Sequence, residues 1–176
     1  MTGARITATI DDKAYRQAVQ QLGGVLRHGL MKTIGVALVE VTQQRFETGT
    51  EPYGARWAPL NPAYAMIKRG PGILRASGML QRTITSQVAG NQVAVGSNRI
   101  YAAVHQFGAV IKPKNGKALA FNLGGGPAGK KGKPGTRLVL ARSVRIPQRP
   151  YLGFGPADQR AVLRVLETEV RHAFGS

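Results

Sequence analysis

Two glycine patterns near the middle of the chain resemble loops that bind nucleotides. A G-x-G-x-x-G pattern begins at Gly124, and a near match to the P-loop ends at Lys130. In both classes of loop the phosphates lie at the N-terminus of a helix that follows at once. Here Pro134 and then a β-rich run follow, and Lys131 stands where a P-loop has the Ser or Thr that holds Mg²⁺. The patterns therefore predict no nucleotide site.

The remaining groups that could do chemistry show no catalytic or metal-binding spacing. The chain has no Cys, which excludes disulfides and Cys-ligated metal sites. His28, His105 and His172 lie far apart, and most of the eight Asp and Glu residues fall at expected helix caps or solvated helix faces. The sequence thus predicts no enzyme activity, no metal and no cofactor. His105 has two interpretations: a structural histidine with a hydrogen bond at a strand or turn edge, or an interface contact.

The charge is concentrated in one part of the 176-residue chain. The net charge is +17, and all sixteen charged residues between Pro52 and Ala157 are basic. The two flanks carry nearly equal numbers of acidic and basic residues. Such a field favours a polyanion or an acidic partner surface. The sequence therefore predicts contact with nucleic acid or with an acidic protein.

Apolar periodicity predicts two long helices. The first runs from about Val25 to Glu47, after a strand near the N-terminus and a short helix that ends at Leu22. Its apolar face is formed by Leu26, Leu30, Ile34, Leu38 and Val41. The second runs from about Pro156 to Phe174, with Asp158 at its positive N-terminal end. Its apolar face is formed by Val162, Leu163, Leu166, Val170 and Phe174.

Several strands are predicted between these helices. Residues 83–88 and 92–95 form a hairpin, residues 118–123 and 137–146 form two more strands, and residues 101–107 form either a helical turn or a strand. Residues 49–72 form a long loop, held down by Trp57, Leu60 and Tyr64. The Gly- and Lys-rich segment 124–136 has no apolar residue that could anchor it.

The order of elements predicts a single α+β domain over residues 1–176. A mostly antiparallel β-sheet is packed by the long helix of the N-terminal half and by the C-terminal helix. Segment 124–136 is the long flexible basic tip of a β-hairpin. No apolar run is long enough to span a bilayer, and the N-terminus lacks a secretory signal, so we expect a soluble domain and no membrane partner.

Four short patterns occur in order along most of the chain. Arg45-Phe46 is followed by PYGARWAPL at 52–60, Lys68 by ILRASGML at 73–80, VGS at 95–97 by YA and HQFG up to Gly108, and IPQRPYLG at 146–153 by Asp158. Together they resemble the phage virion morphogenesis family, also called the tail-completion protein S or Mu-like G family. Gln148 and Tyr151 depart mildly from it, since the family usually has a small residue and Phe there.

The resemblance implies a structural protein of a tailed phage or prophage. Such proteins act in tail completion and head–tail joining, and related neck proteins form rings around the DNA channel, most often hexamers. The chain would then reside in the neck of the virion, after assembly in the bacterial host cytoplasm with other phage neck and tail proteins. The alternative is a sequence-nonspecific nucleic-acid-binding protein. The two near-neutral helices and the lack of an aromatic stacking platform argue against that alternative.

Two sets of residues are candidates for contact. The first is basic, and would face either DNA in the channel or an acidic neighbouring ring: Lys112, Lys114, Lys117, Lys130, Lys131, Lys133 and Arg137. The second would form the subunit or neck interface: Trp57, Leu60, Tyr101, His105, Gln106, Phe107, Arg149, Tyr151 and Leu152. For the aromatic and aliphatic members of the second set, a core role, in which they pin the long loop and strand ends to the sheet, is favoured over the interface role.

Overall fold

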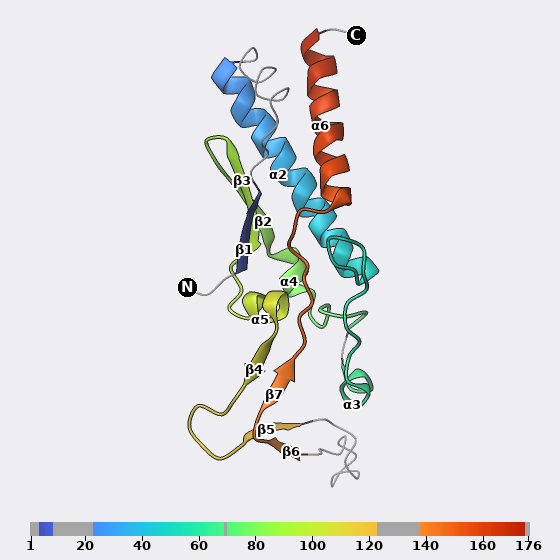
Figure 1. Cartoon of the computed structure of the whole chain (residues 1–176), viewed down its shortest axis with the longest axis vertical. Helices are drawn as coiled ribbons and strands as arrows, with labels where there is room; N and C mark the ends of the chain where they lie inside the picture. The colour runs from blue at the N-terminus through green and yellow to red at the C-terminus, as the bar shows by residue number, and fades with distance from the viewer. Residues whose placement is uncertain (1–3, 9–22, 69, 123–137, 175–176) are drawn as a thin grey trace, which may run out of the picture.

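A long helix lies at the centre of the protein, between a small sheet and the C-terminal helix. The computed structural model describes residues 4–8, 23–68, 70–122 and 138–174. The central helix α2 (Gly23–Thr48) packs against strands β2 (Ile84–Ala89) and β3 (Gln92–Ser97) and against α6 (Pro156–Phe174) (Figure 1). Together these elements form the body of the protein, in which α2 is the middle element.

The sequence of α2 accounts for this central position. Leu30, Ile34 and Leu38 recur at four-residue spacing and are buried, as predicted. The buried stripe is widened by their neighbours Met31 and Gly35, because the helix is covered by the sheet and by α6. A Cβ atom at Gly35 would lie 2.7 Å from the Ser86 hydroxyl, so the absence of a side chain lets α2 approach β2 closely.

The body sheet is antiparallel and has three strands in the order β1-β3-β2, where β1 is Ala4–Ala8. Strands β2 and β3 form the predicted hairpin, and its two-residue turn contains Gly90 at a φ of 57°. Ile84, Val93 and Val95 are buried in the same core as Leu38. Their burial fixes the register, because a shift by one residue would turn these side chains to the opposite face.

The C-terminal helix has the predicted bounds but a narrower buried face than predicted. Ala161 and Val162 are buried, and Val165 and Leu166 are partly buried against the core. Leu163 is 53% exposed and Val170 is 40% exposed, so the prediction was wrong for these two positions. Leu163 lies about 100° around the helix from Val162, and contact with α2 covers only one stripe.

The described residues also form three short helices near the lower end of the body in Figure 1: α3 (Pro62–Ala65), α4 (Met79–Arg82) and α5 (Ala102–Phe107). The last of these settles the open choice between helix and strand at residues 101–107. In the long loop, Trp57 is buried, as predicted, whereas Tyr64 is 42% exposed and does not anchor it.

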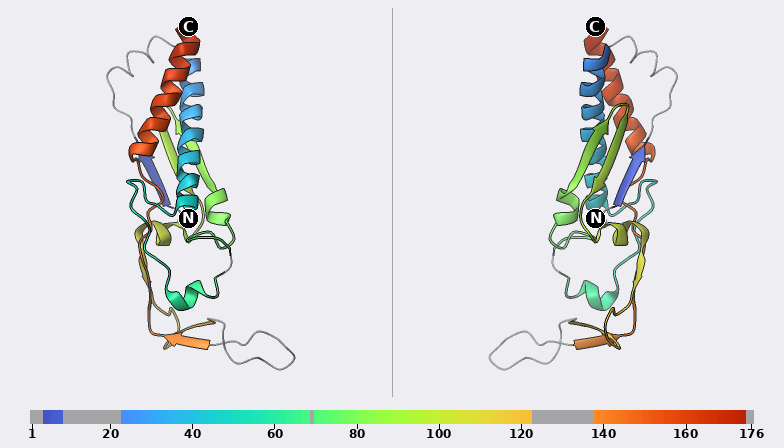
Figure 2. Two further views of the ribbon diagram at one scale, coloured as in Figure 1. Left: turned by 90° about the vertical axis from the view of Figure 1, so that its right-hand side faces the viewer. Right: turned by 90° about the vertical axis from the view of Figure 1, so that its left-hand side faces the viewer.

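Four further strands form a projection that we call the β-arm, residues 109–122 and 138–146. Strands β4 (Ala109–Ile111) and β7 (Val144–Ile146) pair at its base. Strands β5 (Leu119–Asn122) and β6 (Leu138–Ala141) pair farther out and lie across the long axis, away from the two long helices (Figures 1 and 2). The predicted tip at 124–136 lies outside the described residues.

The predicted α+β class is confirmed, with two differences in the strands. Residues 137–146, predicted as one strand, are divided at Arg142-Ser143 into β6 and β7. Within the described residues the strands form one three-stranded and two two-stranded sheets rather than a single sheet. None of the helices within the described segments has the length and apolar content of a membrane span.

Candidate functional site

The β-arm is joined to the body at a junction that contains a buried ion pair. Arg45, in the last turn of α2, lies against Asp158 in the first turn of α6, and both are buried. Arg45 Nη1 also donates to the carbonyl oxygens of Tyr151 at 3.0 Å and Gly153 at 3.4 Å. The Asp158 carboxylate accepts a hydrogen bond from the Gly155 N–H at 2.8 Å. Burial lowers the pKa of Arg45, and the charge of Asp158 opposes that shift.

Gln106 fixes the same stretch of chain to α5. Its Oε1 accepts hydrogen bonds from the N–H groups of Tyr151 and Leu152, each at 3.0 Å, and its Nε2 donates to the Leu152 carbonyl at 2.9 Å. The chain at 151–152 has no strand partner, so this one side chain satisfies backbone groups that burial would otherwise leave unpaired. Gln106 therefore links α5 to a segment 45 residues farther along the chain.

Three aromatic rings pack together at the junction. The ring of Phe46 lies 5.1 Å from that of Tyr151 and 5.5 Å from that of Trp57. The Tyr151 hydroxyl donates to the Ala102 carbonyl, and burial raises the pKa of Tyr151 well above its ordinary value. Trp57 Nε1 donates to the Pro150 carbonyl at 2.7 Å. Each polar group thus has a partner inside an otherwise apolar cluster.

Arg149 ties the long loop to the base of the arm. Its Nε and Nη2 atoms donate to the carbonyl oxygens of Ala58 and Pro59, both at 2.8 Å, and its backbone N–H donates to the His105 carbonyl. Burial lowers the pKa of this guanidinium. Although Arg149 belongs to the basic region, it serves the fold of its own chain and is not available to a polyanion.

His105 lies beside this arginine, half-buried in α5. Burial lowers the pKa of His105, and the charge of Arg149 lowers it further. The buried Nδ1 atom has no hydrogen-bond partner among the described residues, so the hydrogen bond expected of a structural histidine is not formed at that nitrogen. The ring packs edge-on against Tyr101 at 6.0 Å between centroids.

The junction determines where the arm leaves the body. Gly108 follows α5 directly and has a φ of 72°, which L side chains rarely adopt. A Cβ atom there would lie 3.0 Å from the Gln148 nitrogen and 3.1 Å from the Ile146 oxygen. The backbone of the two arm strands therefore meets at a point where only glycine fits.

The junction also explains where the predicted interface residues lie. Five of the nine are buried by their own chain: Trp57, Gln106, Arg149, Tyr151 and Leu152. Leu60 and His105 are half-buried, and Tyr101 and Phe107 are 38% and 61% exposed. Of this set, only the last two present much of their side chain for contact with another molecule.

The predicted basic residues separate in a similar way. Lys112, Lys114 and Lys117 are exposed between β4 and β5. Lys130, Lys131, Lys133 and Arg137 lie outside the described residues.

Two exposed arginines of the arm, Arg142 and Arg145, were not among the predicted contact residues. They were missed because residues 137–146 were predicted to form one continuous strand. The sequence Arg142-Ser143 could have indicated the break between the two strands, because it has neither the β-branched nor the aromatic residues that favour strands.

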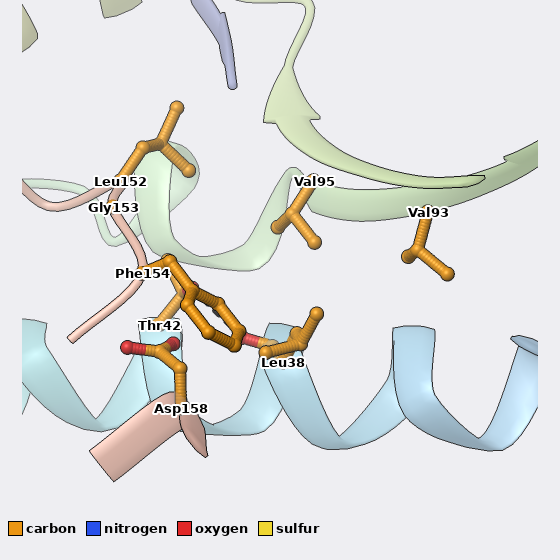
Figure 3. Close-up of a pocket in the computed structure, with 8 residues that line it drawn as sticks. All are labelled: Leu38, Thr42, Val93, Val95, Leu152, Gly153, Phe154 and Asp158. Atoms are coloured by element: carbon orange, nitrogen blue, oxygen red, sulfur yellow. Dashed lines mark hydrogen bonds between the residues drawn. The ribbon is translucent and has the colours of Figure 1, made fainter. Parts of the chain in front are cut away.

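A small cavity lies inside the body of the protein. It has a volume of about 20 Å³ and lies between α2, β3 and the start of α6 (Figure 3), with room for about one water. It is lined by Leu38, Thr42, Val93, Val95, Leu152, Gly153, Phe154 and Asp158. Within the described segments no group of three or more His, Asp or Glu side chains could hold a metal ion. The surface of the β-arm, rather than an internal pocket, is therefore the candidate functional site.

Comparison with known proteins gives one family match and two related proteins. The family model described as the phage virion morphogenesis family matches residues 10–171. Protein G of Escherichia phage Mu, whose name provisionally assigns it to capsid assembly, is 24% identical over 96% of both chains. The Mu-like prophage FluMu G protein 2 of Haemophilus influenzae is 28% identical over 85% of this chain and 84% of its own. No solved structure matches significantly.

We expect Asp158→Ala to lower the free energy of unfolding by about 3–5 kcal/mol, because it leaves the buried Arg45 guanidinium without its counter-ion. Urea denaturation of the purified protein measures the effect. Glu167→Ala, on the exposed side of the same helix, is the matched control and should change stability by less than about 0.5 kcal/mol. The double variant Arg45→Met/Asp158→Leu should be more stable than Asp158→Ala, and equal losses would contradict a dominant role for the unpaired charge.

The lowered pKa of His105 predicts a loss of stability in mild acid. The unfolded chain binds the proton at its ordinary pKa of 6.5, whereas the folded protein resists it to lower pH. Stability from this group is therefore complete above the unfolded pKa and falls as pH decreases through it. Unfolding free energies measured between about pH 7 and pH 5 should fall less in His105→Gln than in the wild type. His172→Gln, at an exposed position of α6, should follow the wild type.

Proposed function

The chain belongs to the phage virion morphogenesis family, and we propose that it acts in tail completion and head–tail joining as a ring in the neck of the particle. Membership over residues 10–171 makes it a phage virion assembly protein. The neck position, the ring, expected to be a hexamer, and the association with other neck and tail proteins are the proposed refinement. The proposed role is structural and involves no catalysis.

The observation that carries this proposal is the charge of the β-arm. Its described residues include five exposed basic side chains and no acidic one: Lys112, Lys114, Lys117, Arg142 and Arg145. The arm extends beyond the body, where these charges can reach a partner (Figure 2). In a ring, repetition of the arm would give a continuous positive surface. That surface would face either DNA in the channel, through phosphate contacts that read no sequence, or an acidic neighbouring ring.

A sequence-nonspecific nucleic-acid-binding protein is the second candidate, and the same positive charge favours it. Among the described residues the exposed aromatic side chains are few: Tyr53 and Tyr64 lie in the long loop, and Tyr101 and Phe107 lie at the two ends of α5, so no strand face presents a row of rings on which bases could stack. The arm is an extended ribbon rather than a basic recognition helix. These features favour the assembly role.

Deletion of the gene from its source genome tests the neck role. We expect electron microscopy of an induced lysate to show filled heads separate from tails, because the joint between them would be incomplete. Intact, infectious particles would contradict the morphogenesis role and favour the nucleic-acid alternative. Normal heads with tails of aberrant length would place the protein at the end of the tail instead.

Charge reversal on the arm tests the role of its basic surface. Complementation of the deletion by Lys112→Glu/Lys114→Glu/Lys117→Glu should lower the titre of infectious particles by at least about tenfold, because like charges would then oppose the partner. The matched control is Arg160→Glu/Arg164→Glu/Arg171→Glu, three exposed cations of α6, which should complement normally. Normal titres from the arm variant would show that these lysines contact no essential partner.

A further inference from the structure

The outer half of the β-arm has apolar side chains on both faces. Alternation along β5 and β6, together with their register, places Leu119, Phe121, Val139 and Ala141 on one face, where all four are half-buried. The opposite face carries Ala120, Leu138 and Leu140. The two leucines are 68% and 66% exposed. A strand pair with this composition is typical of the interior of a larger sheet or sandwich rather than of a free surface.

The arm obtains little cover from its own chain. The main contacts of β5 and β6 are with each other, and within the described residues each of these strands pairs along one edge only. A two-stranded ribbon alone is at best marginally stable in water. Its open edges and exposed leucines make it ready to pair with, and pack against, another protein surface.

The charges around the ribbon indicate the charge of the partner surface. Lys112, Lys114 and Lys117 lie in the chain that leads into β5, and Arg142 and Arg145 follow β6. All five are exposed, and no acidic residue lies in the arm. The arm of a second copy would carry the same positive charges, so pairing between two arms is disfavoured, and a net charge of +17 also disfavours the rest of a second copy as an acidic partner. A DNA backbone would pair with the cations, but its phosphates would leave Leu138 and Leu140 in water.

We propose that the β5–β6 ribbon inserts into an apolar groove with an acidic rim on a different virion protein. Leu138 and Leu140 fill the groove, and the arm cations lie against the rim. This inference rests on the proposed assembly function and replaces its open choice of polyanion with an acidic protein. It follows from the combination of apolar faces and positive flanks, since either feature alone would fit several partners.

Site-specific photo-crosslinking during particle assembly tests the inference. The full-length chain carries p-benzoylphenylalanine in place of Leu140 and is expressed in an induced lysogen that lacks its own copy of the gene. We expect a covalent adduct with one other virion protein of net negative charge, identified by mass spectrometry of the purified adduct. The control carries the same group in place of Leu163, which is 53% exposed on α6 and lies outside the proposed contact.

The adduct must also depend on both parts of the proposed contact. Leu138→Ser, and separately Lys112→Glu/Lys114→Glu/Lys117→Glu, should each reduce adduct yield at position 140 by about tenfold. Val36→Ser, at a 64% exposed position of α2, should leave it unchanged. Melting temperatures close to that of the wild type would show that the variants remain folded, as expected for exposed positions.

The other outcomes overturn the inference in distinct ways. An adduct with a second copy of the chain, with DNA or with a basic protein would identify a different partner. No adduct, or equal adducts from positions 140 and 163, would exclude a specific contact at the ribbon. The deletion phenotype tests the proposed function separately. Separated heads and tails together with an adduct to DNA would leave the neck role standing and remove only the acidic-groove partner.

Discussion

The buried pair of Arg45 and Asp158 is the constraint on which the rest of the structure depends. It joins the end of α2 to the start of α6, and the same guanidinium holds the carbonyls of Tyr151 and Gly153. Burial of two charges is costly, and the attraction between them offsets that cost only when the remaining donors and acceptors are also satisfied. Here the Gly155 N–H and the two carbonyls supply these partners. The pair and its partners therefore tie the end of α2, the start of α6 and residues 151–155 together at one point.

That arrangement divides the molecule into a body that folds on itself and an arm that does not. Gln106, Tyr151 and Arg149 join α5, the long loop and residues 149–153, so these three side chains are used within the chain itself. The arm begins where the junction ends, at Gly108, and little of it enters the hydrophobic core. The body thus fixes the position where the arm begins. The arm itself has few contacts with the core, so contact with a partner could stabilise it.

The sequence predicted those elements whose signal is local. Two β-rich runs joined by a turn at Gly90 located the β2–β3 hairpin. Apolar periodicity located both long helices, because each buries a regular stripe on a neighbour. It failed at Leu163, since periodicity cannot say how wide a stripe the neighbour covers. It also treated Asp158 only as a favourable residue at a helix start, because its partner Arg45 lies 113 positions away. The interface set illustrates the same limit: the residues that carry the family resemblance are the ones that build the junction, and sequence alone could not separate them from residues that face outward.

The positive charge and the exposed leucines of the arm make different contributions to binding. A net charge of +17 attracts polyanions of every kind and is screened by salt, so it favours encounter without selecting a partner. DNA that passes through a neck must slide, and contacts made only with phosphates permit this because they are alike at every position. Exposed leucines on a ribbon do select a partner, because their burial stabilises a complex only where a complementary surface removes them from water. In the proposed assembly role, an arm that combines the two is better suited to a fixed joint between proteins than to the wall of a channel through which DNA moves.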